Sequence, residues 1–411
     1  MRLAVLLCCS LLFLYACNRG ASNQDYPRPV DTQTVPIELQ EKRTYEFPTA
    51  DLRFDNEFDG ARLNDLERIT DSFYVVSITP ENEPINPSPW YAFRIRAERD
   101  QRIRVRISYP NGARHRYFPK LSTDRKNWSP IDSAALIRNL GSSELTLILE
   151  VRAGEPLYVA GQEVINSADV GEWIEGLAVN PRIRTRVIGQ SKLGRDIPHF
   201  SLGTGPLDDR PTIVLLSRQH PPEVTGFLAF RGFIAGLLED PRLEEFLDQY
   251  QVLVYPLLNP DGVDLGHWRH TAGGIDSNRD WARYRQPEAR QVADDVVRTV
   301  REAGSKVVLG IDFHSTYRDV YYTHLDDVQP PTALPGFKDA WLAAVERGIG
   351  GDFRINEEAE PIGRPTTMSW FRKQFGAEGI TYEIGDNTDR DFVERKGRVS
   401  AAALIEVFLV R

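Results

Sequence analysis

The chain has 411 residues, which is more than one small domain needs and favours two domains. Hydrophobic residues make up 41% and charged residues 27% of the chain, so it can bury an ordinary globular core. The net charge of −9 argues against a general nucleic-acid-binding protein, because such proteins need a basic surface to neutralise phosphates. The three cysteines are Cys8, Cys9 and Cys17. The remainder of the chain therefore has no disulfide framework and no zinc site built from several thiolates.

The first residues have the pattern of an export signal. Arg2 is followed by an apolar run from Leu3 to Phe13, which is too short to span a bilayer. The next four residues, Leu14-Tyr15-Ala16-Cys17, resemble a bacterial lipobox, which implies cleavage before Cys17 and lipidation of that cysteine. We therefore expect residues 1–16 to be a lipoprotein signal peptide. The mature protein would be lipid-anchored in the bacterial cell envelope, at the outer membrane and facing the periplasm, because Asn18 rather than Asp follows the cysteine. The alternative is an ordinary signal peptide with an incidental cysteine.

A linker and a β-rich domain are predicted next. Residues 17–45 are polar and proline-containing, which is typical of a linker or tether. Residues 102–109 alternate strictly between charged and apolar side chains, as in a half-buried strand. Further strand candidates are residues 72–78, 90–97, 145–151 and 157–160. We therefore predict an antiparallel β-sandwich as the N-terminal domain, residues 46–164.

Residues 165–411 form the second predicted domain, in which strands alternate with longer helices. The strand candidates are residues 212–216, 252–258, 306–313 and 380–384. The helix candidates are residues 224–238, 288–302, 337–347, 366–375 and 392–409. This alternation predicts an α/β fold with a mixed, mostly parallel sheet flanked by helices. Ligands of such folds bind beyond the carboxyl ends of the strands.

Three candidate metal ligands stand at those strand ends. His220 and Glu223 directly follow the first buried strand, and their spacing of three places both side chains on one side of a turn. His314 ends another predicted strand. Two histidines and one glutamate leave a fourth position for water, which distinguishes catalytic from structural zinc. Asp312, two residues before His314, is expected on the opposite face of the sheet from it, and the pattern gives only weak support for a role behind the ligands.

Four further residues fit hydrolysis beside a metal. Glu383 stands in an apolar strand, where a carboxylate near a metal would act as a general base. Arg269 follows the segment Asn259–Gly262, and an arginine beside zinc can stabilise an oxyanion. Asn278 and Arg279 can hold a carboxylate together.

In their order along the chain, these segments resemble the zinc carboxypeptidases of the funnelin (M14) type. The likeness is to the branch of the cytosolic carboxypeptidases, which carry a β-sandwich before the catalytic domain. It starts at residues 187–195 and continues to the end of the chain. The resemblance implies one Zn²⁺ per chain, with the following residues in the site: His220, Glu223 and His314 as ligands, Arg269 for carbonyl polarisation, Asn278 and Arg279 for the substrate's terminal carboxylate, and Glu383 as the general base. The mobile tyrosine of the pancreatic-type enzymes has no motif match here; Tyr317, Tyr321 and Tyr322 are the candidates.

The implied function is that of a zinc-dependent metallocarboxypeptidase, a hydrolase that acts on peptide or protein C-termini. Its other expected partner is the membrane, through the lipid anchor, and nucleic acid is not expected. Two alternatives use the same zinc fold: a hydrolase of peptidoglycan stem peptides, and an N-acyl amino-acid deacylase. A non-enzymatic binding module is disfavoured because every catalytic position is filled.

Overall fold

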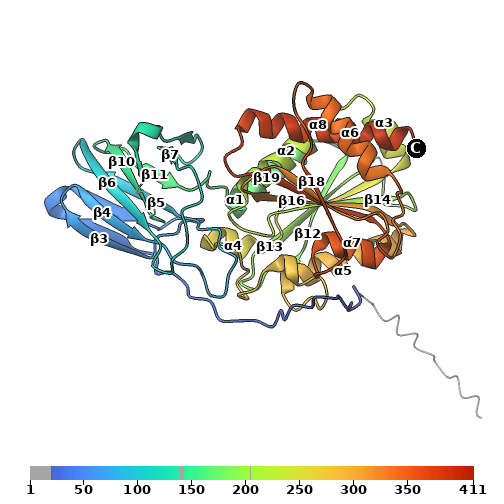
Figure 1. Cartoon of the computed structure of the whole chain (residues 1–411), viewed down its shortest axis with the longest axis horizontal. Helices are drawn as coiled ribbons and strands as arrows, with labels where there is room; N and C mark the ends of the chain where they lie inside the picture. The colour runs from blue at the N-terminus through green and yellow to red at the C-terminus, as the bar shows by residue number, and fades with distance from the viewer. Residues whose placement is uncertain (1–19, 139–142, 204) are drawn as a thin grey trace, which may run out of the picture.

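The computed structural model describes residues 20–138, 143–203 and 205–411. The predicted signal peptide and the lipidation site Cys17 lie outside the described residues. Two units lie side by side in Figure 1: a β-rich unit formed by residues 44–160 and a larger α/β unit that begins at Ser167. Within the described ranges, no helix is both long enough and apolar enough to cross a membrane.

The β-rich unit is a sandwich of two sheets. One sheet has the strand order β1-β2-β5-β11-β7-β8 and the other the order β3-β4-β6-β10-β9. Phe54 and Phe93 of the first sheet share one core with Val105 and Leu147 of the second, so the two sheets pack face to face. The strands are β1 (Thr44–Phe47), β2 (Leu52–Asp55), β3 (Asp65–Thr70), β4 (Phe73–Ser77), β5 (Ala92–Ala97), β6 (Gln101–Ser108), β7 (Lys120–Ser122), β8 (Ser129–Pro130), β9 (Leu136–Arg138), β10 (Leu145–Val151) and β11 (Leu157–Ala160). Two short 3₁₀ helices accompany them, η1 (Pro48–Ala50) and η2 (Ser133–Ala135).

The prediction of a wholly antiparallel sandwich was wrong in one strand pair. Strands β4 and β6 run parallel, with Tyr74 beside Val105. The chain leaves β4, crosses to the other sheet to form β5 and then returns as β6, so that two reversals restore its direction. The other paired strands of both sheets are antiparallel.

The α/β unit contains an eight-stranded mixed sheet in the order β12-β13-β15-β14-β16-β19-β17-β18. Its four central strands, β15, β14, β16 and β19, are parallel, which confirms the predicted fold class. All six residues of β14 are buried, because helices cover both faces of a central parallel strand. The strands are β12 (Ile183–Gln190), β13 (Asp196–Leu202), β14 (Thr212–Ser217), β15 (Gln251–Tyr255), β16 (Val307–Thr316), β17 (Val320–His324), β18 (Glu357–Glu360) and β19 (Glu378–Gly385).

Helices form a layer on each side of this sheet (Figure 1). Helices α2, α6 and α8 share one apolar core, and α5 and α7 share another on the opposite face. The helices are α1 (Ser167–Leu177), α2 (Val224–Glu239), α3 (Leu243–Gln249), α4 (Pro260–Leu265), α5 (Pro287–Ala303), α6 (Phe337–Ile349), α7 (Thr367–Phe375) and α8 (Arg390–Leu409), with the 3₁₀ helix η3 (Ser277–Arg279).

The described part of the predicted linker is hydrogen-bonded to the α/β unit. From residue 20 onward it runs along the α/β unit before it enters the sandwich (Figure 1). The backbone N–H of Arg28 donates to the Gly363 carbonyl at 2.8 Å. The Thr32 hydroxyl donates to Asp280 at 2.5 Å, and Thr32 is buried. These bonds fix the segment on the surface of the α/β unit.

One buried histidine of the sheet makes stability depend on pH. His199 on β13 is 2% exposed and packs against the Tyr255 ring, with ring centroids 4.7 Å apart. Burial, together with the nearby Arg186, lowers the pKa of His199 to about 3. In the unfolded chain the pKa is about 6.5. Between these two pKa values, only the unfolded state binds a proton at His199. The folded state is therefore not destabilised by His199 above about pH 6.5, and its free energy of unfolding falls as the pH decreases below that value.

We predict that the variant His199→Gln loses less stability in acid than the wild type does. The wild type should lose about 2 kcal/mol more unfolding free energy than the variant between pH 7.5 and pH 5. Urea unfolding at both pH values measures this difference. Equal losses in the two proteins would contradict a neutral buried His199.

Candidate active site

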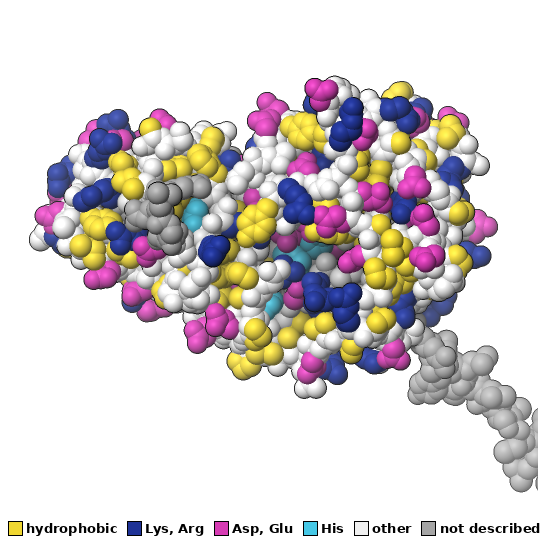
Figure 2. Space-filling model, viewed as in Figure 1, with side chains coloured by type: hydrophobic (Ala, Val, Ile, Leu, Met, Phe, Trp, Pro, Cys, Tyr) yellow, Lys and Arg dark blue, Asp and Glu magenta, His cyan; other side chains and the backbone are white. Residues whose placement is uncertain are grey.

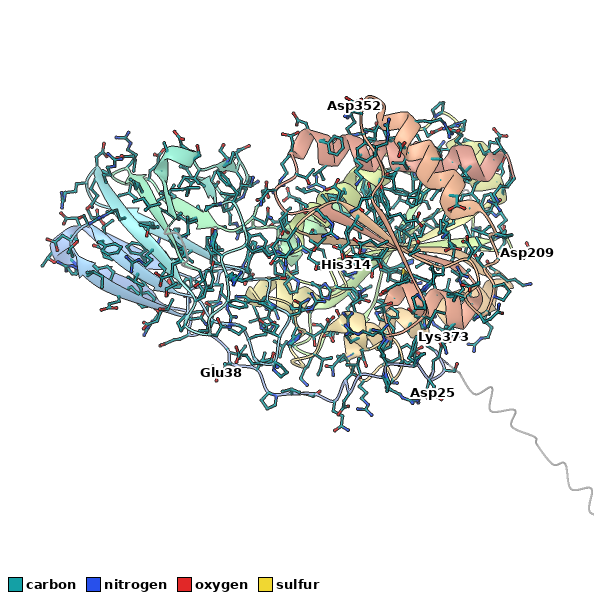
Figure 3. All side chains as sticks on the ribbon, in the orientation of Figure 1. Asp25, Glu38, Asp209, His314, Asp352 and Lys373 are labelled. Carbon is teal, nitrogen blue, oxygen red and sulfur yellow. The ribbon has the colours of Figure 1, made fainter. Side chains whose placement is uncertain are left out.

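The three candidate metal ligands come together at the carboxyl edge of the central sheet. His220 and Glu223 lie in the turn between β14 and α2, and His314 lies near the end of the adjacent parallel strand β16. Figure 3 shows the position of His314 in the whole molecule. Gly226, in the first turn of α2, packs against the backbone of His314. A Cβ atom there would lie 2.4 Å from the His314 carbonyl oxygen, so glycine is what allows this close approach.

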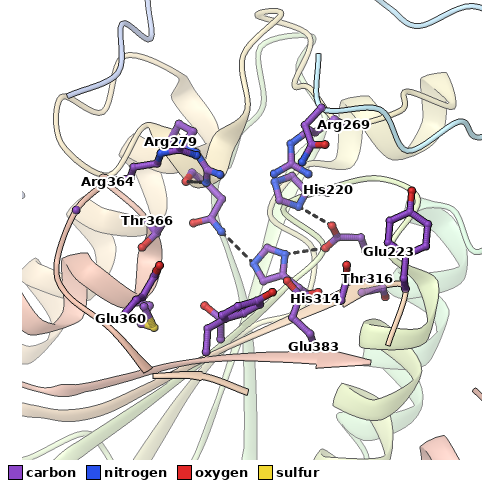
Figure 4. A pocket seen from close by; sticks show the side chains of 18 of the residues that line it. His220, Glu223, Arg269, Arg279, His314, Thr316, Glu360, Arg364, Thr366 and Glu383 are labelled. Atoms are coloured by element: carbon purple, nitrogen blue, oxygen red, sulfur yellow. Dashed lines mark hydrogen bonds and ion pairs between the residues drawn. The ribbon is translucent and has the colours of Figure 1, made fainter. Parts of the chain in front are cut away.

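Glu223 joins the two histidines. One carboxylate oxygen lies 2.8 Å from His220 Nδ1 and the other 2.7 Å from His314 Nδ1 (Figure 4). The three residues offer ligand atoms that all lie within 4.8 Å of one another. Burial alone would raise the pKa of Glu223, but the two histidines outweigh it and hold the pKa well below its usual range. The carboxylate is therefore ionised, as a metal ligand has to be.

The other ring nitrogen of each histidine, Nε2, contacts a carboxylate of its own. Asp276 Oδ1 lies 2.8 Å from His220 Nε2, and Asp312 Oδ2 lies 2.7 Å from His314 Nε2. Such outer carboxylates orient ligand histidines and increase their basicity. The expected position of Asp312 was wrong. Residues two apart on a strand point to the same face, so its side chain lies beside His314.

Asp276, which the sequence pattern did not single out, also binds an arginine. Its Oδ2 accepts a hydrogen bond from Arg269 Nε at 2.8 Å and lies 4.0 Å from Arg279 Nη1. Burial alone would raise the pKa of Asp276, but Arg269, Arg279 and His220 hold it well below its usual range. In the sequence, only its position two residues before Asn278-Arg279 could have pointed to Asp276. Aspartates at such positions also occur as ordinary turn caps, so the position alone is not specific. Here Asp276 caps η3 by accepting the N–H of Asn278 at 2.9 Å.

Asn278 connects this turn to its neighbours. Its amide oxygen accepts the backbone N–H of Thr367 at 2.9 Å, at the start of α7. Its amide nitrogen lies 3.4 Å from His314 Nε2. Arg279, which follows, donates from Nη1 to the Asn278 carbonyl at 2.7 Å and lines the cavity. The predicted Asn-Arg pair therefore lies beside the candidate metal ligands, with its arginine at the cavity wall.

Glu383 lies on β19, where its backbone is paired with that of His314 on β16. The side chain is half-buried and lines the same cavity. Among the described residues, nothing donates a hydrogen bond to its Oε2 atom. Burial and the charge of Glu223 raise the pKa of Glu383 to about 8. A bound divalent cation would lower this pKa, because a nearby positive charge favours the ionised carboxylate.

These side chains surround a cavity of about 460 Å³ (Figure 4). In Figure 2, histidine side chains are visible in the hollow between the two units, with Lys and Arg side chains at its border. The β-sandwich and the N-terminal segment supply part of the wall, through Asn86, Pro87, Arg116 and Arg28. The sequence singled out none of these four residues, because their types and spacing form no motif for metal or substrate chemistry. Only packing of the β-sandwich and the N-terminal segment on the α/β unit brings them to the cavity.

Arg116 ties the sandwich to the strand ends. Its guanidinium makes two hydrogen bonds to the Asp386 carboxylate, of 2.6 and 3.2 Å, and one to the Ser315 carbonyl at 3.3 Å. Ser315 directly follows His314. The Arg116 and Asp386 side chains are only 7% and 2% exposed, so this ion pair is largely shielded from water.

The three candidate tyrosines lie in different places. Tyr317 and Tyr322 line the cavity, and Tyr317 is 71% exposed. Tyr321 is buried in the core of the α/β unit. His267 and His270, which flank Arg269, are buried outside the cavity lining and do not join the ligand cluster.

A buried His-Glu-His cluster, outer carboxylates and a partly exposed glutamate in one cavity define a metal-dependent hydrolase site. Comparisons with known proteins agree. The family model described as zinc carboxypeptidase matches residues 170–347. An uncharacterised protein of Zymomonas mobilis is 25% identical over 303 residues, which cover 70% of this chain and 71% of that protein. Cytosolic carboxypeptidase 3 of Mus musculus is 24% identical over 258 residues, covering 56% of this chain but only 26% of the mouse protein.

The fold has solved counterparts. The crystal structure of a metallo-carboxypeptidase from Burkholderia cenocepacia matches with a TM-score of 0.70 and 20% identity, and the match covers 87% of this chain and 98% of that one. Residues 170–347 thus match a zinc carboxypeptidase domain, the domain of a zinc-dependent hydrolase. The metal implied by this domain is Zn²⁺, and the donor set of His220, Glu223 and His314 fits it.

We predict that Asp312→Asn weakens zinc binding roughly 10- to 100-fold, because the change removes the negative charge behind the His314 imidazole. Competition with a chelator of known zinc affinity measures the effect. Asp248→Asn, at an exposed position on α3, is the matched control and should bind zinc like the wild type. Wild-type affinity in Asp312→Asn would contradict the orienting contact.

Proposed function

We propose that the protein is a metallocarboxypeptidase that removes residues from the C-termini of peptides or proteins. The observation that carries this proposal is the content of one cavity. A zinc ligand set, a carboxylate with an unbonded oxygen and two arginines, Arg269 and Arg279, all line it. Hydrolysis of a C-terminal peptide bond would use each of these groups: the metal to activate water, the carboxylate to move the proton and the arginines to bind negative charge.

In this proposal Glu383 moves the proton. Zinc, when bound, lowers the pKa of a coordinated water and polarises the carbonyl oxygen of the substrate. The Glu383 carboxylate accepts the proton of the attacking water and later delivers it to the leaving amine. The free Oε2 atom of Glu383 supports this role, because no competing hydrogen bond among the described residues holds it.

The two arginines would bind different charges of the substrate. Arg269 is placed by Asp276 and would donate to the oxyanion of the tetrahedral intermediate. Arg279 would hold the terminal carboxylate, a charge that an internal peptide bond lacks. An internal peptide bond would place an uncharged group against Arg279 and lose this ion pair, so the pairing favours cleavage at the C-terminus.

The location of the enzyme belongs to the same proposal. The sequence up to Cys17 supports a lipid-anchored protein of the bacterial cell envelope, facing the periplasm. Peptidoglycan stem peptides are present there and also end in a free carboxylate. They are therefore the second substrate class that an assay has to include.

The proposal predicts chelator-sensitive release of C-terminal amino acids. The purified mature protein should cleave a peptide library with free carboxyl termini, and it should leave the same peptides intact when they are amidated. Removal of the metal by a chelator should abolish release, and added Zn²⁺ should restore it. Mass spectrometry of the digests measures the amino acids released under each of these conditions. Cleavage of stem peptides alone would favour the peptidoglycan hydrolase, and cleavage of N-acyl amino acids alone would favour the deacylase.

A substitution of Arg279 tests the proposed binding of the terminal carboxylate directly. Arg279→Ala should lower kcat/KM for free-carboxylate peptides roughly 10- to 100-fold, because it removes hydrogen bonds to a charged group. Arg285→Ala, at an exposed position in the same segment, is the matched control and should retain wild-type kinetics. Undiminished preference for free carboxylates in Arg279→Ala would contradict this role of Arg279.

The role of Glu383 is tested separately. Glu383→Gln should keep stoichiometric zinc, since Glu383 is not among the candidate ligands, but it should lose at least roughly 10²-fold in kcat, because the amide cannot accept the proton. Metal analysis and steady-state kinetics on the same preparation measure both quantities. Glu172→Gln, an exposed glutamate on α1, is the control. Near-wild-type turnover in Glu383→Gln would assign the base to another group.

A further inference from the structure

The segment that presents Arg269 has little regular structure to hold it. Residues 266–276, called here the arginine loop, connect α4 to η3 and contain no helix or strand. The guanidinium is fixed at one point, the 2.8 Å hydrogen bond to Asp276. The backbone of the loop needs other partners if Arg269 is to keep its position.

Those partners come from the β-sandwich. Glu81 lies between β4 and β5 and is fully buried. Its carboxylate accepts three consecutive backbone N–H groups of the arginine loop: Trp268 at 2.7 Å, Arg269 at 2.9 Å and His270 at 2.6 Å. Hydrogen bonds to an ionised acceptor are about twice as strong as neutral ones, so this is a firm attachment between the two units.

The charge of Glu81 is maintained although the group is buried. Burial alone would raise the pKa of Glu81, but His267, Arg62 and His270 outweigh it and lower the pKa below its usual value. A buried carboxylate is costly unless it is paired and hydrogen-bonded. Here the compensating N–H groups belong to the loop that carries Arg269, so the loop and the carboxylate depend on each other.

Neighbouring residues strengthen the same attachment. Asn82 Oδ1 lies 2.7 Å from His270 Nδ1, and its amide nitrogen donates to the Gly274 carbonyl at 3.0 Å. The Trp268 side chain is buried within the sandwich core and donates from its indole N–H to the Trp90 carbonyl at 3.1 Å. The sandwich therefore holds the arginine loop at several points on both sides of Arg269.

We propose that Glu81 of the β-sandwich is a positioning residue for the active site, which fixes the backbone of residues 268–270 and thereby aims the Arg269 guanidinium at the reacting carbonyl. The proposal rests on the function proposed above, because it needs Arg269 to act on the substrate. A displacement of about 1 Å at a reacting centre can cost roughly 10²-fold in rate, so the backbone position is a sensitive quantity.

The test compares Glu81→Gln with Glu83→Gln, an exposed glutamate of the same segment. A carboxamide presents an N–H donor where Glu81 has a second acceptor oxygen, so one backbone N–H of the loop would face another donor. We expect kcat of Glu81→Gln to fall roughly 10- to 100-fold with KM within about threefold of wild type and with unchanged zinc content. Glu83→Gln should match the wild type in all three.

A double-mutant cycle separates positioning from a general structural role. If Glu81 acts through Arg269, the change Glu81→Gln should lower kcat less than about threefold in an Arg269→Ala background. An equal loss in both backgrounds would overturn the proposal. Asn82→Ala removes two contacts of the same attachment, those to His270 and Gly274, and should lower kcat more mildly. This variant provides the test if Glu81→Gln fails to fold.

Hydrogen exchange tests the attachment without any activity assay. The amides of residues 268–270 should exchange at least about tenfold faster in Glu81→Gln than in the wild type and in Glu83→Gln, because one of them loses its acceptor and the weakened attachment lets the loop open more often. Unchanged exchange would overturn the proposal even if activity falls. If the wild type cleaves no peptide, the proposed function fails, and the exchange result then decides the attachment alone.

Discussion

The arrangement of the site depends on one buried carboxylate. Glu223 accepts hydrogen bonds from His220 and His314, at 2.8 and 2.7 Å, and so joins a loop after β14 to the neighbouring strand β16. A carboxylate out of water is tolerated only when it is paired. The two histidines meet that requirement, and a metal bound between them and Glu223 would meet it as well. Both arrangements require that the parallel strands keep their register and that α2 begins close against β16. The small side chain at Gly226 makes that approach possible.

The same constraint extends outward from this centre. Three further carboxylates around the cavity are compensated by other residues: Asp276 by Arg269 and His220, Asp312 by His314, and Asp386 by Arg116. One of these partners, Arg116, comes from the β-sandwich, which therefore helps to support the site. Glu81 and Arg116 reach the arginine loop and the end of β16, on two sides of one cavity. The segment from residue 20 onward adds Arg28 to the wall.

Much of the fold followed from local pattern. The continuous apolar run of β14 and the strict alternation of β6 each identify a strand, because they reflect burial on two faces or on one. Helix α2 begins at the predicted residue 224 and ends one residue beyond the predicted 238. The parallel pairing of β4 with β6 could not be read in this way. It depends on which sheet the intervening strand joins, and that is set by contacts far apart in the chain.

The sequence by itself determined the class of the domain and identified the main polar groups, since His220, Glu223 and His314 stand at or near strand ends within the segment that matches the zinc carboxypeptidase family model. The tertiary structure alone decided which residues support them. Asp276 bonds to both His220 and Arg269, and Glu81 accepts three N–H groups from a loop almost 190 residues away. Neither residue has a motif, because a carboxylate in a turn has no distinguishing local pattern. Its role arises only when folding removes it from water and leaves a particular set of donors as its partners.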